Sequence, residues 1–267
     1  MKNLNSLDSL CAALSYAMGI EAPQFAAAPN AELCAYLDKT LNGEKADRIF
    51  MYNPDAIAQW IYEKYPHMFE EAKQRTDVEI PLCSVMPSVT PVCFGTMYTG
   101  AQPQVHGIQA YKKPVISIDT IFDALIRCGK KPAIVSYAKS SMSMIYLNRN
   151  MDYFLFDDVE QVNAKAAELI LRDEHDFIAV YNGNYDSHMH KFGPESTESL
   201  GELRANVRTF GMFYEMIAEQ WKSHNTLLGF AMDHGCHEID DNCGSHGLDM
   251  DEDLNIVHLY KLIGREK

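Results

Sequence analysis

Residues 177–194 read FIAVYNGNYDSHMHKFGP, a short apolar run that gives way to a polar loop. Similar apolar runs occur at 48–53 (RIFMYN), 132–137 (PAIVSY) and 226–232 (TLLGFAM), and such runs are typical of strands buried on both faces. Segments with helical periodicity alternate with them: DTIFDALIRCGK, DVEQVNAKAAELILRD and SLGELRANVRTFGMFYEMIAEQW. This alternation predicts an α/β protein, a three-layer α/β/α sandwich with a mostly parallel central sheet.

Length and composition narrow the class of protein. A chain of 267 residues with 47% hydrophobic residues can bury one sizeable core, which favours a single domain. The formal net charge of -14 opposes binding to long nucleic acids. Seven cysteines without regular spacing favour thiols in a reducing compartment, and no apolar run approaches the roughly 18 residues of a membrane span. We therefore expect a cytoplasmic protein that binds neither long nucleic acid nor membranes.

The first 45 residues differ in pattern from the rest of the chain. They contain two stretches with helical periodicity, LDSLCAALSYAM and AELCAYLDKTL, separated by the proline-containing EAPQFAAAPN. Asp8 and the lack of a basic leading segment favour an amphipathic helix over a signal peptide. We expect residues 1–45 to form a helical extension packed on a catalytic core at 46–267, within a single domain.

Three of the apolar runs are followed by residues that can bind a cation. Asp55 follows the run at 48–53, Asp186 follows the run at 177–182, and Asp233 and His234 follow the run at 226–232. Because parallel strands end at one edge of a sheet, where open α/β sheets bind ligands, we expect these side chains to converge. A single aspartate after a strand is common in turns and caps, so the prediction of a site depends on the convergence of three loops.

Two histidines extend this set. His190 lies four residues after Asp186, so both face one ion if the chain turns helically there, and His246 lies twelve residues after His234. Imidazole and carboxylate are the ligands that zinc uses in proteins, and two groups of three or four such ligands can hold two ions.

Two alternatives compete with a pair of metal ions. The histidines can be surface residues of polar turns, because a lone D-x-x-x-H pattern is a weak signal. The segment can also hold one structural zinc through Cys236, His237 and Cys243, although the C-x₆-C spacing is unusual for such sites.

A hydroxyl at position 90 is the candidate nucleophile. Thr90 precedes Pro91, and threonine at a cap with proline at the first helical position starts a helix, so a purely structural role also explains it. A helix start at the ligand edge presents free backbone N–H groups to an anion. A metal that lowers the pKa of the Thr90 hydroxyl would make it a nucleophile for phosphorus.

In this order, the segments resemble the alkaline phosphatase superfamily, most closely its type I phosphodiesterase/nucleotide pyrophosphatase branch. The resemblance covers roughly residues 46–264. Thr90 lies ten residues before Gly100 of a T-G pair, which is followed by PQVHGI at 103–108. DSHMHKFGP is similar to the branch's D-x-x-G-H-x-x-G-P, and MDHG is similar to its S-D-H-G.

The resemblance implies a nucleophile and two divalent ions, zinc or alternatively manganese. Thr90 is then the catalytic residue and a contact of one ion. Cys93 occupies a position where the branch often has an asparagine that helps to bind the phosphoryl oxygens, which makes it the implied substrate-binding residue. Ala56 stands where the family usually has a glycine after its first aspartate. The implied metal ligands are Asp186, His190 and His246 for one ion, and Asp55, Asp233 and His234, with Thr90 beside them, for the other.

The resemblance therefore implies a two-metal hydrolase of small phosphate diesters or pyrophosphates, working through a phosphothreonine intermediate on Thr90. Its substrate would be a small phosphorylated molecule, nucleotide-like or another diester. The absence of arginine from 91–126 favours diesters over the more highly charged monoesters. A phosphomonoesterase or phosphonate hydrolase is the alternative on the same metal core, and a non-catalytic metal- or ligand-binding protein with this fold is a further one. Only about 95 residues separate Thr90 from Asp186, which leaves little room for a large cap domain, and we expect none.

Overall fold

The computed structural model describes residues 1–239 and 242–266. A seven-stranded sheet with the order β2-β9-β6-β1-β5-β3-β4 forms its centre. Neighbouring strands among β6, β1, β5, β3 and β4 pair in parallel, and β9 pairs antiparallel with β6 and β2. The mostly parallel sheet is confirmed. The strands of this sheet are β1 (Arg48–Pro54), β2 (Val78–Cys83), β3 (Pro132–Tyr137), β4 (Asp152–Phe156), β5 (Phe177–Asn182), β6 (Thr226–Phe230) and β9 (Asn255–Ile263).

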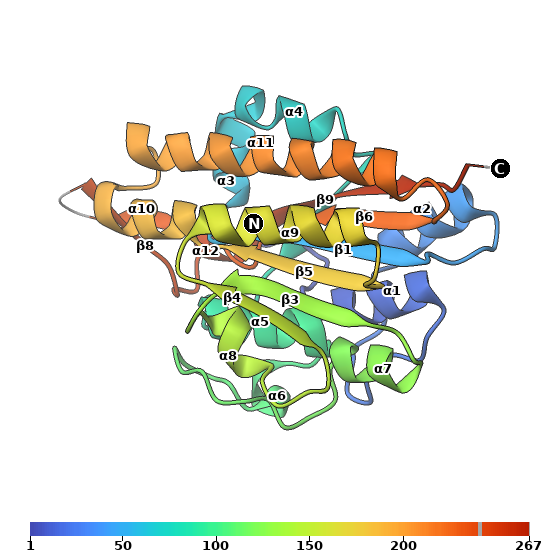
Figure 1. Cartoon of the computed structure of the whole chain (residues 1–267). Coiled ribbons are helices and arrows are strands. Elements are labelled where there is room, and N and C mark those ends of the chain that lie inside the picture. The colour runs from blue at the N-terminus through green and yellow to red at the C-terminus, as the bar shows by residue number, and fades with distance from the viewer. Residues whose placement is uncertain (240–241, 267) are drawn as a thin grey trace.

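Helices cover both faces of the sheet, as the alternation of segments predicts (Figure 1). One face carries α3 (Gln59–Lys64), α4 (Glu70–Lys73), α9 (Val159–Arg172) and α11 (Thr197–Gln220). The other carries α1 (Ser9–Met18), α5 (Thr90–Thr99), α7 (Ile121–Arg127) and α8 (Ser141–Ile145). In the part of the chain that the structure describes, no helix combines the length and apolarity needed to cross a membrane.

Shorter elements surround these layers. The segment η1 (Pro66–Met68) links α3 to α4, and α2 (Ala31–Leu41) packs against α1 and β2. A small antiparallel hairpin of β7 and β8 lies against α10. The remaining bounds are α6 (Pro103–His106), α10 (Asn184–Phe192), α12 (Asp251–Leu254), β7 (His237–Ile239) and β8 (Cys243–Ser245).

Side chains of β1 point alternately to the two helical layers and hold the strand between them. The ring centroids of Phe50 and Tyr52 lie 5.1 and 5.7 Å from that of Phe213 on α11. The next residue along the strand, Asn53, accepts a 2.7 Å hydrogen bond through its side chain from the hydroxyl of Tyr98 on α5. Successive side chains of a strand point to opposite faces, so both layers hold β1. This packing fixes the end of β1, where the first predicted metal ligand follows.

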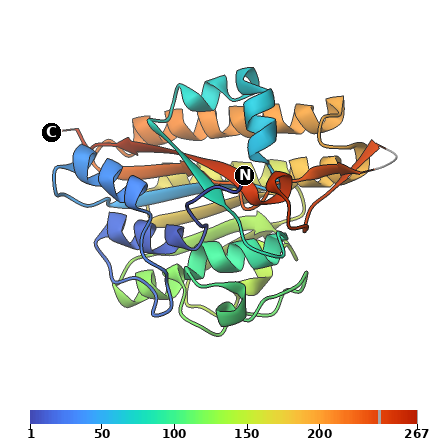
Figure 2. The same ribbon diagram turned by 180° about the vertical axis from the view of Figure 1, so that it is seen from behind.

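The N-terminal segment runs along the outer edge of the sheet (Figure 2). Ser6 forms a parallel bridge with Cys83 at the end of β2, and the Leu7 amide donates a 2.9 Å hydrogen bond to the Cys83 carbonyl. From there α1 packs against α5, with a side chain such as Leu14 fully buried. The N-terminal residues thus support the helix that begins at Thr90.

Candidate metal centre

Two groups of candidate metal ligands lie beyond the carboxyl ends of the central strands. In each group, one donor atom per residue lies within 4.8 Å of the others. The first group follows β1 and β6 and is fully buried, whereas the second is formed by α10 and the segment after β8 and is partly exposed. We call them the inner cluster (Asp55, Asp233 and His234) and the outer cluster (Asp186, His190 and His246).

The inner cluster surrounds the ring nitrogen Nε2 of His234. This atom lies 3.4 Å from Asp55 Oδ1 and 3.4 Å from Asp233 Oδ2. The second oxygen of Asp233, Oδ1, accepts a 3.2 Å hydrogen bond from the backbone amide of Ala56. Ala56 has a φ of 62°, in the left-handed region that favours glycine. The backbone at position 56 therefore adopts a conformation that favours glycine, although the residue is alanine.

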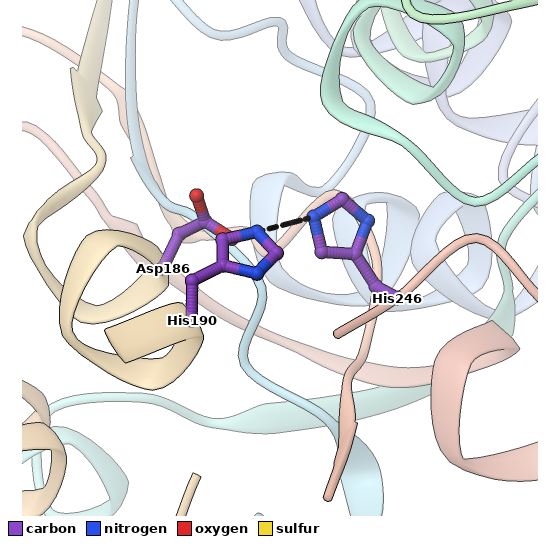
Figure 3. Close-up of side chains that lie close together, drawn as sticks. All are labelled: Asp186, His190 and His246. Atoms are coloured by element: carbon purple, nitrogen blue, oxygen red, sulfur yellow. Dashed lines mark hydrogen bonds and ion pairs between the residues drawn. The ribbon is translucent and has the colours of Figure 1, made fainter. Parts of the chain in front are cut away.

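The outer cluster brings two imidazole rings onto one carboxylate (Figure 3). Nε2 of His190 and Nε2 of His246 lie 3.3 and 3.4 Å from Asp186 Oδ1, and 3.1 Å from each other. Asp186 and His190 sit one helical turn apart on α10, so the predicted helical turn is present. The intervening His188 points away, because its Nδ1 contacts the Asn184 carbonyl at 2.9 Å.

Hydrogen bonds at the far side of each ring fix the tautomer of all three histidines. A carbonyl oxygen only accepts, so a ring nitrogen that bonds it must carry the hydrogen. When the ring is neutral, the other nitrogen, Nε2, carries the lone pair and directs it into the cluster, as in metal-ligating histidines. The contacts of Nδ1 are those of His190 with the Gly244 carbonyl at 3.0 Å, His246 with the Ser88 carbonyl at 2.8 Å, and His234 with the Gly235 carbonyl at 2.9 Å.

The carboxylates in turn present oxygens without any partner. Asp55 Oδ1, Asp186 Oδ1 and Asp233 Oδ2 are buried and accept no hydrogen bond. Burying such an atom unsatisfied is costly, and proteins rarely do so without reason. Lone pairs of nitrogen and oxygen that converge on one point fit a divalent cation, and the His/Asp donor set is one that zinc accepts.

The pKa values of the aspartates and histidines in both clusters are shifted from their usual values when no cation is bound. Burial, together with the charge of Asp186, raises the pKa of Asp55 to about 7. Burial and the neighbouring Asp55 raise the pKa of Asp233 well above its usual value, and burial lowers the pKa of His234 well below its own. The Asp186 carboxylate, whose Oδ1 lies 3.3 Å from Nε2 of His190, raises the pKa of His190 to about 9. A divalent ion would favour the charged carboxylates and the neutral imidazoles instead.

The two clusters adjoin each other. The rings of His234 and His246, one from each cluster, stack with their centroids 4.1 Å apart and an interplanar angle of 29°. Two ions bound by these clusters would therefore be neighbours, as in the two-metal sites that act on phosphate esters.

Thr90 lies at the inner cluster. Its hydroxyl oxygen is 3.4 Å from Asp55 Oδ2 and 3.4 Å from His234 Nε2, and the residue is only 4% exposed. The cap residue of α5 is Val89 rather than the predicted Thr90, so the helix begins one residue earlier than expected, with Pro91 in its first turn. The Thr90 hydroxyl contacts the cluster instead of the helix backbone, which favours the functional interpretation over the capping one.

Cys93 lies behind the inner cluster. Its side chain is fully buried, and its sulfur contacts the Ser84 hydroxyl at 3.2 Å. Ser84 donates a 2.6 Å hydrogen bond to the Asp233 carbonyl. Burial raises the pKa of the Cys93 thiol well above its usual value, so the thiol stays neutral. This placement favours a role for Cys93 in packing behind the inner cluster, through Ser84, over the direct contact with substrate that the resemblance implies.

The alternative of a cysteine-based zinc site receives no support from the geometry. Across residues 1–239 and 242–266, no group of converging metal ligands includes a cysteine. Cys236 is fully buried next to the Tyr185 hydroxyl at 3.8 Å, and His237 Nδ1 lies 2.6 Å from Asp253.

Asp253 is a supporting residue that the sequence did not reveal. This fully buried carboxylate contacts His237 and accepts a 2.8 Å hydrogen bond from the Leu248 amide. Its own carbonyl accepts a 2.8 Å hydrogen bond from the Gly235 amide. Asp253 therefore connects the backbone at Gly235, next to His234, with the backbone at Leu248, two residues after His246. Only its position in an acidic run was visible in the sequence, and acidic runs are usually solvated.

We expect Gly235→Ala to destabilise the protein. A Cβ atom at this position would lie 2.0 Å from the backbone carbonyl oxygen of Glu252, so the two segments would have to separate. The free energy of unfolding should fall by about 1–3 kcal/mol, as for other overpacked sites. Denaturant unfolding measures it. Gly201→Ala is the matched control, because nothing lies within 4 Å of that Cβ position, and an equal loss in both variants would refute the close contact.

Comparison with known proteins places the chain in a family. A family model described as type I phosphodiesterase/nucleotide pyrophosphatase matches residues 117–264, more than half of the chain. The matched range includes every predicted metal ligand except Asp55, and it lies after Thr90. No curated protein matches the sequence.

Solved structures share the fold. Mouse ectonucleotide pyrophosphatase/phosphodiesterase 5, an inactive variant in complex with AMP, superposes with a TM-score of 0.60 at 16% identity, over 73% of this chain and 59% of its own. Phosphonoacetate hydrolase from Sinorhizobium meliloti, in complex with phosphonoformate, gives 0.55 at 17% identity, over 73% and 59%. The chain thus spans less than two thirds of either structure. Because the family model matches more than half of it, this chain belongs to the type I phosphodiesterase/nucleotide pyrophosphatase family of the alkaline phosphatase superfamily.

Proposed function

We propose that the protein is a two-metal-dependent hydrolase of small phosphate diesters or pyrophosphates that uses Thr90 as its nucleophile. The observation that carries this proposal is the position of the Thr90 hydroxyl, 3.4 Å from both Asp55 and His234, beside carboxylate oxygens that lack any partner. Membership of the family supports the class of reaction.

The inner cluster would hold the ion beside Thr90, and the outer cluster would hold the second ion. Zinc is our first choice because each cluster offers three nitrogen and oxygen donors, as catalytic zinc sites do, with manganese as the alternative. Bound ions would lower the pKa of the threonine hydroxyl and withdraw charge from the phosphoryl oxygens.

The chain's own residues then account for two displacement steps. In the first, the Thr90 oxygen forms a bond to phosphorus while the bond from phosphorus to the leaving oxygen breaks. Asp55 Oδ2 lies 3.4 Å from the Thr90 oxygen and accepts a hydrogen bond from the hydroxyl in the resting geometry, so this carboxylate would take the hydroxyl proton and return it to the leaving oxygen. In the second step, water displaces the threonine oxygen from phosphorus and restores the free hydroxyl.

The first turn of α5 supports binding of the phosphoryl group. A helix start presents backbone N–H groups and the positive end of the helix dipole to an anion. Because Thr90 is the first residue of this ten-residue helix, the nucleophile and these donors lie together. The same arrangement suits a nucleotide or another small diester.

The test is a comparison of rates on matched substrates. We expect bis-p-nitrophenyl phosphate and a dinucleotide to be hydrolysed faster than p-nitrophenyl phosphate or an aryl phosphonate ester, with zinc and with manganese added separately. Faster turnover of the monoester or of the phosphonate would replace our proposal with the alternative activity on the same metal core. A protein that binds the ions but hydrolyses none of the four would be a binding protein with this fold.

A further inference from the structure

Tyr181 contacts the inner cluster, although neither the motifs nor the family match singled it out. It is the penultimate residue of β5 and pairs in register with Asn53 of β1. Its hydroxyl donates a hydrogen bond to Asp55 Oδ2. The Tyr181 ring packs edge-on against the rings of Phe94 and Tyr137, with centroid distances of 5.5 and 6.1 Å. The residue is 7% exposed. The hydroxyl therefore has a fixed position.

The two oxygens of Asp55 have different surroundings. Oδ2 accepts the hydrogen bond from Tyr181 and lies 3.4 Å from the Thr90 hydroxyl, whereas Oδ1 is buried without a partner and faces His234 Nε2 at 3.4 Å. We propose that Tyr181 is a positioning residue that occupies Oδ2, so that Asp55 presents only Oδ1 to the ion of the inner cluster. This inference rests on the proposed metal centre.

The two carboxylate oxygens of Asp233 also differ in their surroundings, but here the hydrogen-bond donor is a backbone amide. The Ala56 amide occupies Oδ1 at 3.2 Å and leaves Oδ2 without a partner. With one free oxygen from each aspartate and one nitrogen from His234, the inner cluster offers three donors. Zinc is bound well by a small number of donors, whereas manganese prefers a fuller set of oxygen ligands. Tyr181 should therefore favour zinc over manganese at this cluster.

Gly183 provides the space that this arrangement needs. A Cβ atom at position 183 would lie 2.8 Å from the Tyr181 hydroxyl oxygen and 3.3 Å from the ring carbon that carries it. The φ of Gly183 is -99°, which any residue adopts, so the backbone itself does not require glycine here. The need for glycine arises from the position of the hydroxyl.

Tyr181→Phe tests the inference through metal binding, read by competition with a chromophoric zinc chelator. Removing a residue that orients a metal ligand typically costs about 10- to 100-fold in affinity. We expect one of the two zinc equivalents to weaken by that factor, the other to keep its affinity, and the preference for zinc over manganese to fall. Tyr137→Phe is the matched control, because within the described structure its hydroxyl makes no contact with Asp55.

A second variant covers the case in which Tyr181→Phe fails to fold. Gly183→Ala keeps the hydroxyl but displaces it, and should weaken the same zinc equivalent, whereas Gly201→Ala should not. If the parent binds two zinc ions and both Tyr181→Phe and Gly183→Ala bind them within twofold of the parent, the role of Tyr181 is refuted and the metal centre stands. If the parent binds neither zinc nor manganese, the metal centre itself is refuted, and the inference with it. A parent that binds manganese but no zinc keeps the metal centre and refutes the role of Tyr181 in favouring zinc.

Discussion

Thr90→Ala should abolish turnover and leave the metal content unchanged. The substitution removes the atom that attacks phosphorus, and loss of a catalytic nucleophile commonly costs about 10³-fold or more in kcat. The substitution leaves Asp55, Asp233 and His234, the three residues of the inner cluster, unchanged, so the bound metal should remain. Steady-state rates on bis-p-nitrophenyl phosphate and elemental analysis of the same preparation measure the two effects.

The control for this variant is Thr40→Ala. Thr40 is an exposed threonine whose hydroxyl donates a 2.8 Å hydrogen bond to a backbone carbonyl within α2, so its loss should leave kcat within about twofold. If Thr90→Ala hydrolyses the diester as fast as the parent, Thr90 is not the nucleophile. If it loses both activity and metal, the threonine acts chiefly by holding the ion.

Removal of the metal ions should lower the melting temperature by roughly 10 °C. A ligand present at about a thousand times its Kd stabilises the folded state by about 4 kcal/mol, and each kcal/mol shifts Tm by about 2–4 °C in a protein of this size. The metal-free protein must also bury Asp55, Asp186 and Asp233 with partnerless oxygens. Differential scanning calorimetry with and without a chelator measures the shift, and zinc in excess over the chelator should reverse it.

A pair of aspartate variants separates this effect from any general action of the chelator. Asp233→Asn weakens the inner cluster, so the chelator should lower its Tm by less than it lowers that of the parent. Asp38→Asn changes an exposed aspartate on α2 and should keep the full response. A chelator that leaves the Tm of the parent unchanged would contradict a metal centre built into the folded state.

The sequence was informative about the fold where strands are buried on both faces. β1, β3 and β5 have the bounds of continuous apolar runs to within one residue, because each lies between two helical layers. β2 and β4 form the edges of the sheet. β2 alternates between exposed and buried residues, which interrupts its apolar run, and no residue of the short β4 is fully buried. Pro81 within β2 also argues against a strand, but an edge strand tolerates it. The antiparallel β9 was hidden because His258 and Lys261 interrupt its apolar pattern.

The site followed from the sequence as far as local spacing reaches. Asp186 and His190 share a helix face, and the apolar runs predicted that Asp55, Asp233 and His234 follow strands. The pairing of His234 and His246 across adjoining clusters depends on how the hairpin of β7 and β8 folds back against α10, which spacing does not specify. Tyr181 and Asp253 were not predicted, because a tyrosine in a strand and an aspartate in an acidic run have common structural explanations.

The number of metal ions per chain tests the central claim most directly. Protein purified without chelator, analysed by elemental analysis, should contain about two zinc or manganese ions per chain. Asp233→Asn and His190→Ala, which each remove a ligand of a different cluster, should each retain about one, and Thr90→Ala should retain both. Parent protein with no bound zinc or manganese, or with a single ion that both ligand variants retain in full, would contradict the two-metal centre.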